Sequence, residues 1–102
     1  MYYEDMDLCK RARNIDKNVL MINDLFCYHF HGLSSRIDYK TEIKTKTEVL
    51  LSKIKYVKKH FTGFNKLLLV YFIYFSILFE LLLFSTFSKV KRGILLTFLK
   101  RI

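Results

Sequence analysis

The chain has 102 residues and a net charge of +9, from 18 Lys and Arg against 9 Asp and Glu. This length allows one small domain at most, and two cysteines are too few for a disulfide framework. The three glycines are scattered, so no glycine-rich phosphate-binding loop exists, and no catalytic motif is present. The sequence therefore predicts a protein without enzyme activity and without a cofactor.

Residues 1–62 are expected to form a small region that faces the cytosol. The first residues, MYYEDMD, are acidic, whereas a secretory signal begins with a basic segment. Further along, an apolar residue recurs every three or four positions, which predicts an amphipathic helix. The same stripe is typical of a short coiled-coil seam with another chain, and both interpretations stay open. The residues of the stripe are Leu8, Ala12, Ile15, Val19, Ile22 and Phe26.

Alternating polar and apolar residues predict a β-hairpin over residues 25–44, although a helix there is the open alternative. Every even position from Arg36 to Glu48 is charged, which is typical of a strand with one polar face. Residues 32–35, Gly-Leu-Ser-Ser, would form the turn. A two-stranded hairpin is only marginally stable alone, so it would need a helix or a partner against its aromatic face.

Cys27, His29 and His31 would point to the same face of that hairpin, and Cys9 offers a fourth ligand of the types that zinc prefers. Their spacing matches no common zinc-binding pattern. We therefore expect a packed cysteine, surface histidines and no metal site.

A basic amphipathic helix is predicted over residues 46–61. Thr45 and Glu48 fit a capping box, which would start this helix. The helix precedes the most apolar part of the chain, so its lysines are predicted to contact anionic lipid headgroups, at about 1 kcal/mol each. The alternative is that they simply face the solvent. These lysines are Lys53, Lys55, Lys58 and Lys59.

Residues 64–88 are predicted to form the single transmembrane helix of a mainly α-helical membrane protein. The stretch from Leu67 to Ser88, LLLVYFIYFSILFELLLFSTFS, holds 15 Leu, Ile, Val or Phe residues. As a helix it would reach about 33 Å, against a hydrocarbon core of about 30 Å. The apolar residues favour insertion by about 4 to 9 kcal/mol, which exceeds the cost of about 2.5 to 3.5 kcal/mol for one buried acid, Glu80.

Glu80 and Ser76 lie four residues apart, on the same face of this helix. One interpretation is that they contact another membrane subunit, because acids inside a bilayer are usually paired. The other is that Glu80 is protonated and merely tolerated. Both interpretations stay open.

Residues 89–102 are predicted to be a short basic tail with five basic residues and no acid. Lys89, Lys91 and Arg92 are expected to contact lipid headgroups as well. Both flanks of the span are basic, so the positive-inside rule does not choose an orientation. We expect the N-terminal part in the cytosol, because 66 residues cross a membrane less readily than 14. This layout resembles that of tail-anchored membrane proteins.

The sequence thus predicts a small single-pass membrane protein that serves as an accessory or anchoring component of a membrane complex. One alternative is a bilayer-perturbing toxin or lysis peptide. Another is a reading frame without a selected function, because the composition is rich in residues with AT-rich codons. The basic residues lie beside an apolar segment, which suits anionic lipid and disfavours nucleic acid as the partner.

Overall fold

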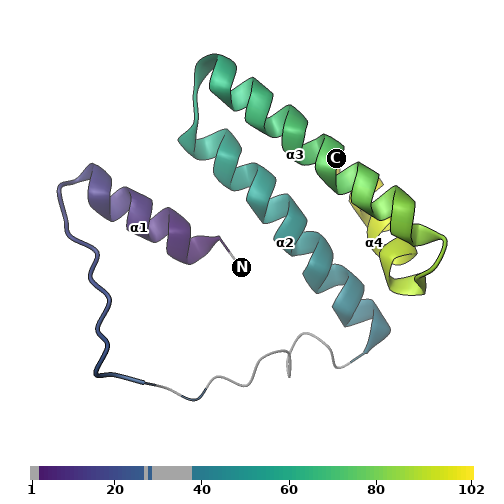
Figure 1. Cartoon of the computed structure of the whole chain (residues 1–102), viewed down its shortest axis with the longest axis horizontal. Helices are drawn as coiled ribbons and strands as arrows, with labels where there is room; N and C mark the ends of the chain where they lie inside the picture. Colours follow the sequence, from purple (N-terminus) through teal and green to yellow (C-terminus); the bar gives the residue numbers. More distant parts are fainter. Residues whose placement is uncertain (1–2, 27, 29–37) are drawn as a thin grey trace.

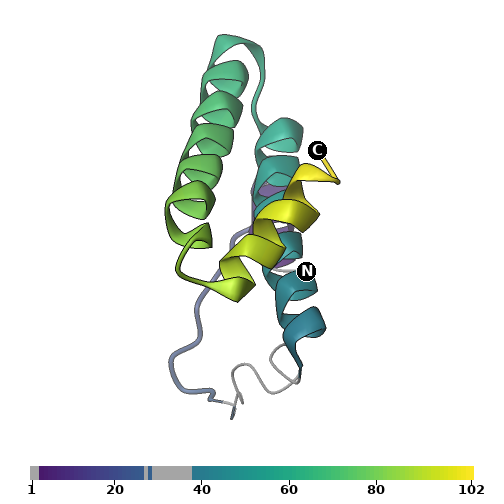
Figure 2. The same cartoon turned by 90° about the vertical axis from the view of Figure 1, so that its right-hand side faces the viewer.

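The regular structure of the chain, in a computed structural model that describes residues 3–26, 28 and 38–102, consists of α-helices. The helices are α1 (Glu4–Asn14), α2 (Tyr39–His60), α3 (Gly63–Ser85) and α4 (Lys89–Leu99). Helices α2 and α3 lie side by side and run in opposite directions, and α4 packs against both (Figures 1 and 2). Helix α1 lies on the other side of α2 from α3 (Figure 1).

Helices α2, α3 and α4 share one hydrophobic core. Each helix contributes three buried residues to it. They are spaced three or four residues apart, except for one adjacent pair in α4, so they lie on one face of each helix. Phe98 of α4 is completely buried, which places α4 as an integral part of the bundle. The core residues are Leu51, Ile54 and Val57 of α2, Ile73, Ile77 and Leu81 of α3, and Ile94, Leu95 and Phe98 of α4.

Helix α2 begins at Tyr39, so the strand predicted up to residue 44 is wrong over its described part. Asp38 caps the helix: its side chain accepts hydrogen bonds from the backbone N–H groups of Lys40 (2.8 Å) and Thr41 (3.0 Å). The Thr41 hydroxyl also donates to this carboxylate, and these bonds lower the pKa of Asp38. The remainder of the predicted hairpin, including its turn, lies outside the described residues, except for residues 25, 26 and 28, which form neither helix nor strand.

The capping box predicted at Thr45 does not start the helix either. Thr47, inside the box, is fully buried and donates its hydroxyl to the carbonyl of Ile43, one turn earlier. Ile43, Thr47, Leu51 and Ile54 have helical spacing, and this stripe determines the conformation, because it packs on α3 and α4. The helix predicted over 46–61 is therefore present, but it begins seven residues earlier.

Helix α1 ends at Asn14, well before the last residue of the apolar stripe that predicted it. Asp16 adopts a left-handed conformation (φ 55°), and the N–H of Lys17 donates to the carbonyl of Ala12 (2.9 Å). Residues 15–26 continue without helix or strand, and their apolar members are exposed. The prediction of one helix reaching Phe26 is wrong: the helix ends before Asp16, and the second half of the stripe, Val19, Ile22 and Phe26, is 40%, 63% and 88% exposed.

Helix α3 has 23 residues and covers most of the segment predicted as 64–88. It is the one helix within the described ranges that is long and apolar enough to cross a membrane. Gly63 begins it with a left-handed backbone (φ 59°), which glycine adopts without strain. The short basic tail predicted after it forms α4, whose N-terminus is capped by Ser88.

Candidate membrane-binding surface

Helix α3 presents a broad apolar surface that no described residue covers. At about 100° per residue, the exposed apolar side chains cover an arc of about 160°, opposite to the buried Ile73 and Ile77. Their exposed fractions range from 53% to 74%. We call this surface the outer face of α3; it consists of Phe64, Leu67, Leu68, Tyr71, Phe72, Phe75, Phe79, Leu82 and Leu83.

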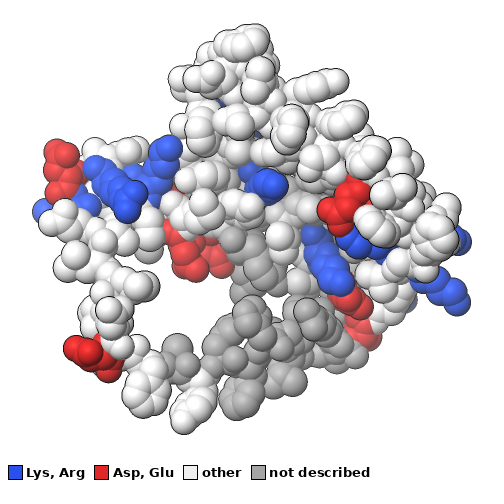
Figure 3. Space-filling view, viewed as in Figure 1, with Lys and Arg blue, Asp and Glu red and all other residues white. Residues whose placement is uncertain are grey.

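Charged residues are sparse over α3 and gather elsewhere on the molecule. In the space-filling view, blue and red side chains concentrate over α1, α2 and the end of the bundle near α4 (Figure 3). Soluble monomers rarely expose a contiguous apolar area of this kind unless it binds a membrane or another protein. The outer face of α3 is therefore the strongest candidate for a functional surface.

Glu80, predicted to contact another subunit, has a partner within its own chain. Its carboxylate forms an ion pair with the ammonium group of Lys91 in the first turn of α4. The Glu80 side chain is 54% exposed and that of Lys91 is 34% exposed, so this pair lies at the surface. Ser76, one turn earlier, is exposed at the border of the outer face.

A recess of about 210 Å³ lies between α2, α3 and α4, beside this ion pair. Its walls are apolar, apart from Glu80, Lys91 and Lys46 at the edge. This pair was not predicted, because residues 89–102 were expected to be a tail. The link of only three residues between α3 and α4 folds the first turn of α4 back onto α3. The apolar lining residues are Val49, Leu50, Ile77, Leu81 and Ile94.

The other basic residues predicted to contact lipid lie in different surroundings. Lys53 is half-buried and Lys55 is exposed, while Lys58 places its ammonium group 5.7 Å from the centre of the Tyr74 ring on α3. Arg92 donates to the carbonyl of Ser85 (3.2 Å), where it satisfies a group at the C-terminal end of α3. The backbone carbonyl of Lys89 accepts from the Tyr39 hydroxyl (2.7 Å). Their contact with lipid stays a prediction.

Helix α1 has no buried residue and shares no core with the bundle. Polar and aromatic contacts attach it to the C-terminal end of α2. Asp7 accepts from Lys59 and His60, both at 2.6 Å, and pairs with Arg11 at 3.0 Å. These bonds lower the pKa of Asp7 to about 2. The Tyr3 and Tyr56 rings lie 5.6 Å apart, and the Lys10 ammonium group lies 4.9 Å from the Phe61 ring.

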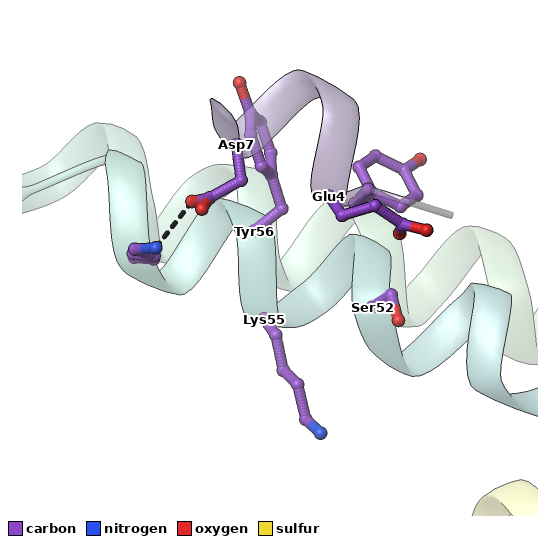
Figure 4. Close-up of a pocket in the computed structure, with 7 residues that line it drawn as sticks. Glu4, Asp7, Ser52, Lys55 and Tyr56 are labelled. Atoms are coloured by element: carbon purple, nitrogen blue, oxygen red, sulfur yellow. Dashed lines mark ion pairs between the residues drawn. The ribbon is translucent and has the colours of Figure 1, made fainter. Parts of the chain in front are cut away.

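A cleft of about 250 Å³ between α1 and α2 accompanies these contacts (Figure 4). Glu4 and Asp7 approach it from α1, and Ser52 and Tyr56 from α2, while Lys55 points away toward the solvent (Figure 4). The lining of the cleft combines carboxylates with amines and hydroxyls, and it includes the ion pair of Asp7 with Lys59. We interpret it as the joint between α1 and the bundle.

Replacing Asp7 with Asn is expected to detach α1 at neutral pH, because the neutral amide cannot form an ion pair with Lys59 or Arg11. In the wild type, the lowered pKa means that folding favours the carboxylate, so the contact is complete above about pH 4 and is lost as the pH falls toward 2. Hydrogen exchange of the α1 backbone amides, corrected for intrinsic rates, should accelerate several-fold in Asp7→Asn at neutral pH and in the wild type as the pH falls toward 2. The core amides around Ile54 should not change. Asp5→Asn, on an exposed position of α1, is the matched control, and equal protection in wild type and Asp7→Asn would contradict the assignment.

Within the described residues, no group of three or more His, Cys, Asp or Glu side chains is placed to hold a metal ion. Cys27, His29 and His31 lie outside the described residues, so the structure does not test the metal interpretation of that segment. The hydrogen bond from Arg101 lowers the pKa of Glu48, and the two side chains form an ion pair.

Comparison with protein families, curated proteins and solved structures finds no match to this chain.

Proposed function

We propose that the chain is a small, non-enzymatic, single-pass membrane protein, in which α3 anchors an accessory component of a membrane complex. The observation that carries this proposal is the outer face of α3, with nine large apolar residues more than half exposed. A helix of 23 residues reaches about 34 Å, which is enough to cross a hydrocarbon core of about 30 Å. Lipid would cover this face at a gain of about 25 cal/mol for each Å² of apolar surface removed from water.

Basic residues at both ends of α3 support an anionic membrane as the environment. Lys58, Lys59 and Lys66 lie near its first turn, and Lys91 and Arg92 follow its last turn. Each such residue near an anionic surface contributes about 1 kcal/mol. The same chemistry is proposed for the remaining predicted headgroup contacts, which are Lys53, Lys55 and Lys89.

The orientation and the partner are part of the proposal. We place residues 1–62 in the cytosol, since they are longer and more charged than the segment after α3. A second subunit is proposed to contact Ser76 and Glu80. Both side chains are exposed on α3. An exposed acid on an intramembrane helix favours a polar or basic group on the second subunit.

A bilayer-perturbing peptide is the second candidate, and one observation favours it. Both α2 and α4 combine an apolar stripe with several basic residues, which is typical of helices that lie in a membrane surface. Induced expression with a membrane-potential dye separates the candidates, because only a perturbing peptide depolarises the cell rapidly.

Alkaline carbonate extraction of membranes from cells that express the tagged full chain tests the proposed function. We expect the protein in the membrane pellet, because alkaline carbonate strips proteins that are held by charge but not those held by a buried span. Release into the supernatant would refute the anchor. Protease treatment of sealed membranes then tests the orientation, because an N-terminal tag on the cytosolic side is digested while the membrane is intact.

A further inference from the structure

The links on either side of α3 are short, and this limits where α2 and α4 can be when α3 crosses a membrane. Two residues, Phe61 and Thr62, join α2 to α3, and residues 86–88 join α3 to α4. If α3 spans the bilayer, the end of α2 lies at one surface and the start of α4 at the other. The hydrocarbon core, about 30 Å thick, then separates these two points.

In the packed bundle, however, α2 and α4 are in direct contact. The Tyr39 hydroxyl, at the start of α2, donates to the carbonyl of Lys89, at the start of α4 (2.7 Å). Gly93 also lies directly against α2, because a Cβ atom at this position would overlap with Cδ1 of Ile43. A further ion pair joins Glu48 to Arg101, beyond the end of α4. These contacts require the start of α2 to lie beside the end of α3.

Helix α2 cannot keep this position while α3 is inside a bilayer. It would have to cross the hydrocarbon alongside α3, and nine of its 22 residues are Lys or Glu. Charged residues near the centre of a membrane are each strongly unfavourable. Five of the nine lie between residues 44 and 55, in the middle of α2, and together they outweigh what α3 gains by insertion. The charged residues are Lys40, Glu42, Lys44, Lys46, Glu48, Lys53, Lys55, Lys58 and Lys59.

We propose that the packed bundle is the form of this protein outside the bilayer, and that α3 enters the membrane by exchanging α2 and α4 for lipid. The inference rests on the proposed function of α3 as a membrane anchor. On insertion, α2 and α4 separate and lie on opposite surfaces. After insertion, the hydrocarbon of the bilayer therefore covers the inner face of α3, which is the stripe of Ile73, Ile77 and Leu81.

The exchange leaves the apolar residues of the core covered in both forms. In the bundle, the inner face of α3 packs on the stripes of α2 and α4. In the membrane, this face meets hydrocarbon, and the two released helices turn their stripes into the interface, with their basic residues among the headgroups. The outer face of α3 is covered only in the membrane, and this difference favours the open form where lipid is present.

A disulfide between α2 and α4 tests the proposal, because it holds the bundle closed without changing α3. Cγ1 of Ile43 would lie 3.1 Å from a Cβ at position 93. Since Cβ of Ile43 is one bond further, the two Cβ atoms would lie within about 4.6 Å, close to the roughly 3.5 to 4.5 Å of a disulfide. The variant Ile43→Cys/Gly93→Cys is made in a Cys9→Ser/Cys27→Ser background, and the full chain is oxidised before it meets preformed vesicles of zwitterionic and anionic phospholipid.

We expect the reduced variant to resist carbonate extraction from the vesicles. The carbonate-resistant fraction of the oxidised variant should be at least about tenfold lower, because the disulfide keeps the bundle closed. The single variant Ile43→Cys in the same background, treated with the same oxidant, controls for the treatment, because it leaves Gly93 unchanged. Equal resistance of both forms would overturn the proposal and leave the anchor intact. Release of the wild type and of both forms would instead refute the anchor and this inference together.

A second variant keeps the test independent of disulfide formation. Gly93→Leu places a large side chain against Ile43 and the Tyr39 hydroxyl, so it pushes α4 away from α2. The sequence of α3 is unchanged, so its own preference for lipid is the same. The carbonate-resistant fraction at limiting lipid should rise several-fold above that of the wild type. An unchanged or lower fraction would overturn the proposal.

Discussion

Replacing Phe72 and Phe75 with lysine is expected to abolish insertion of α3 while the α2–α4 bundle keeps its fold. Both positions lie near the middle of Gly63–Ser85, where a lysine costs about 2.5 to 3.5 kcal/mol and a lost phenylalanine adds about 0.3 to 0.6 kcal/mol. The pair of changes therefore opposes insertion by about 6 to 8 kcal/mol. The wild-type helix favours insertion by about 1 to 6 kcal/mol once the acid at Glu80 is included, so the two lysines cancel or exceed this preference.

The bundle should tolerate the same changes, because Phe72 and Phe75 are 66% and 57% exposed on the outer face of α3. Carbonate extraction should release the double variant, while its circular dichroism in water stays helical. Phe64→Lys/Leu67→Lys is the matched control: it adds the same charge on the same face, but at the end of α3, where lysine reaches the headgroups. Release of both double variants would mean that charge, rather than depth, decides the outcome.

Helix α3 could be predicted from the sequence because its signal is local. A long run of apolar residues specifies a helix that lipid can surround, whatever the rest of the chain does. The strand predicted up to residue 44 failed for the opposite reason. Its alternation of charged and apolar residues coexists with a helical stripe through Ile43 and Thr47, and the choice between them depends on α3, α4 and the cap at Asp38.

The partner of Glu80 could not be predicted from the local pattern alone. Residues 89–102 were predicted to be a basic tail, because they hold five basic residues and no acid, and their apolar stripe is short. The completely buried Phe98 makes that stripe part of the core, and packing of α4 brings Lys91 to Glu80. The basic residues predicted to contact lipid thus include one, Lys91, that pairs with Glu80 of α3 in the bundle.

Replacing Glu80 with leucine is expected to raise the inserted fraction of α3 more than tenfold. Glu80 lies five residues before Ser85, about 7.5 Å inside the proposed span. An acid there costs up to about 3 kcal/mol, and leucine contributes about 0.5 kcal/mol. In the bundle, the exposed pair with Lys91 contributes about 1 kcal/mol at most, and a leucine would extend the apolar recess beside Ile77. Titration with limiting amounts of vesicles, followed by carbonate extraction, measures the change.

Lys91→Leu separates the two reasons for which insertion could rise. This variant breaks the same ion pair but leaves the acid on α3, so it should not increase the inserted fraction if the acid itself opposes insertion. An equal rise in both variants would show instead that the pair acts as a contact holding α4 to α3. If Glu80 also contacts a second subunit, Glu80→Leu should insert and yet run as a smaller complex on native gels. An unchanged inserted fraction would show that this residue stays outside the hydrocarbon.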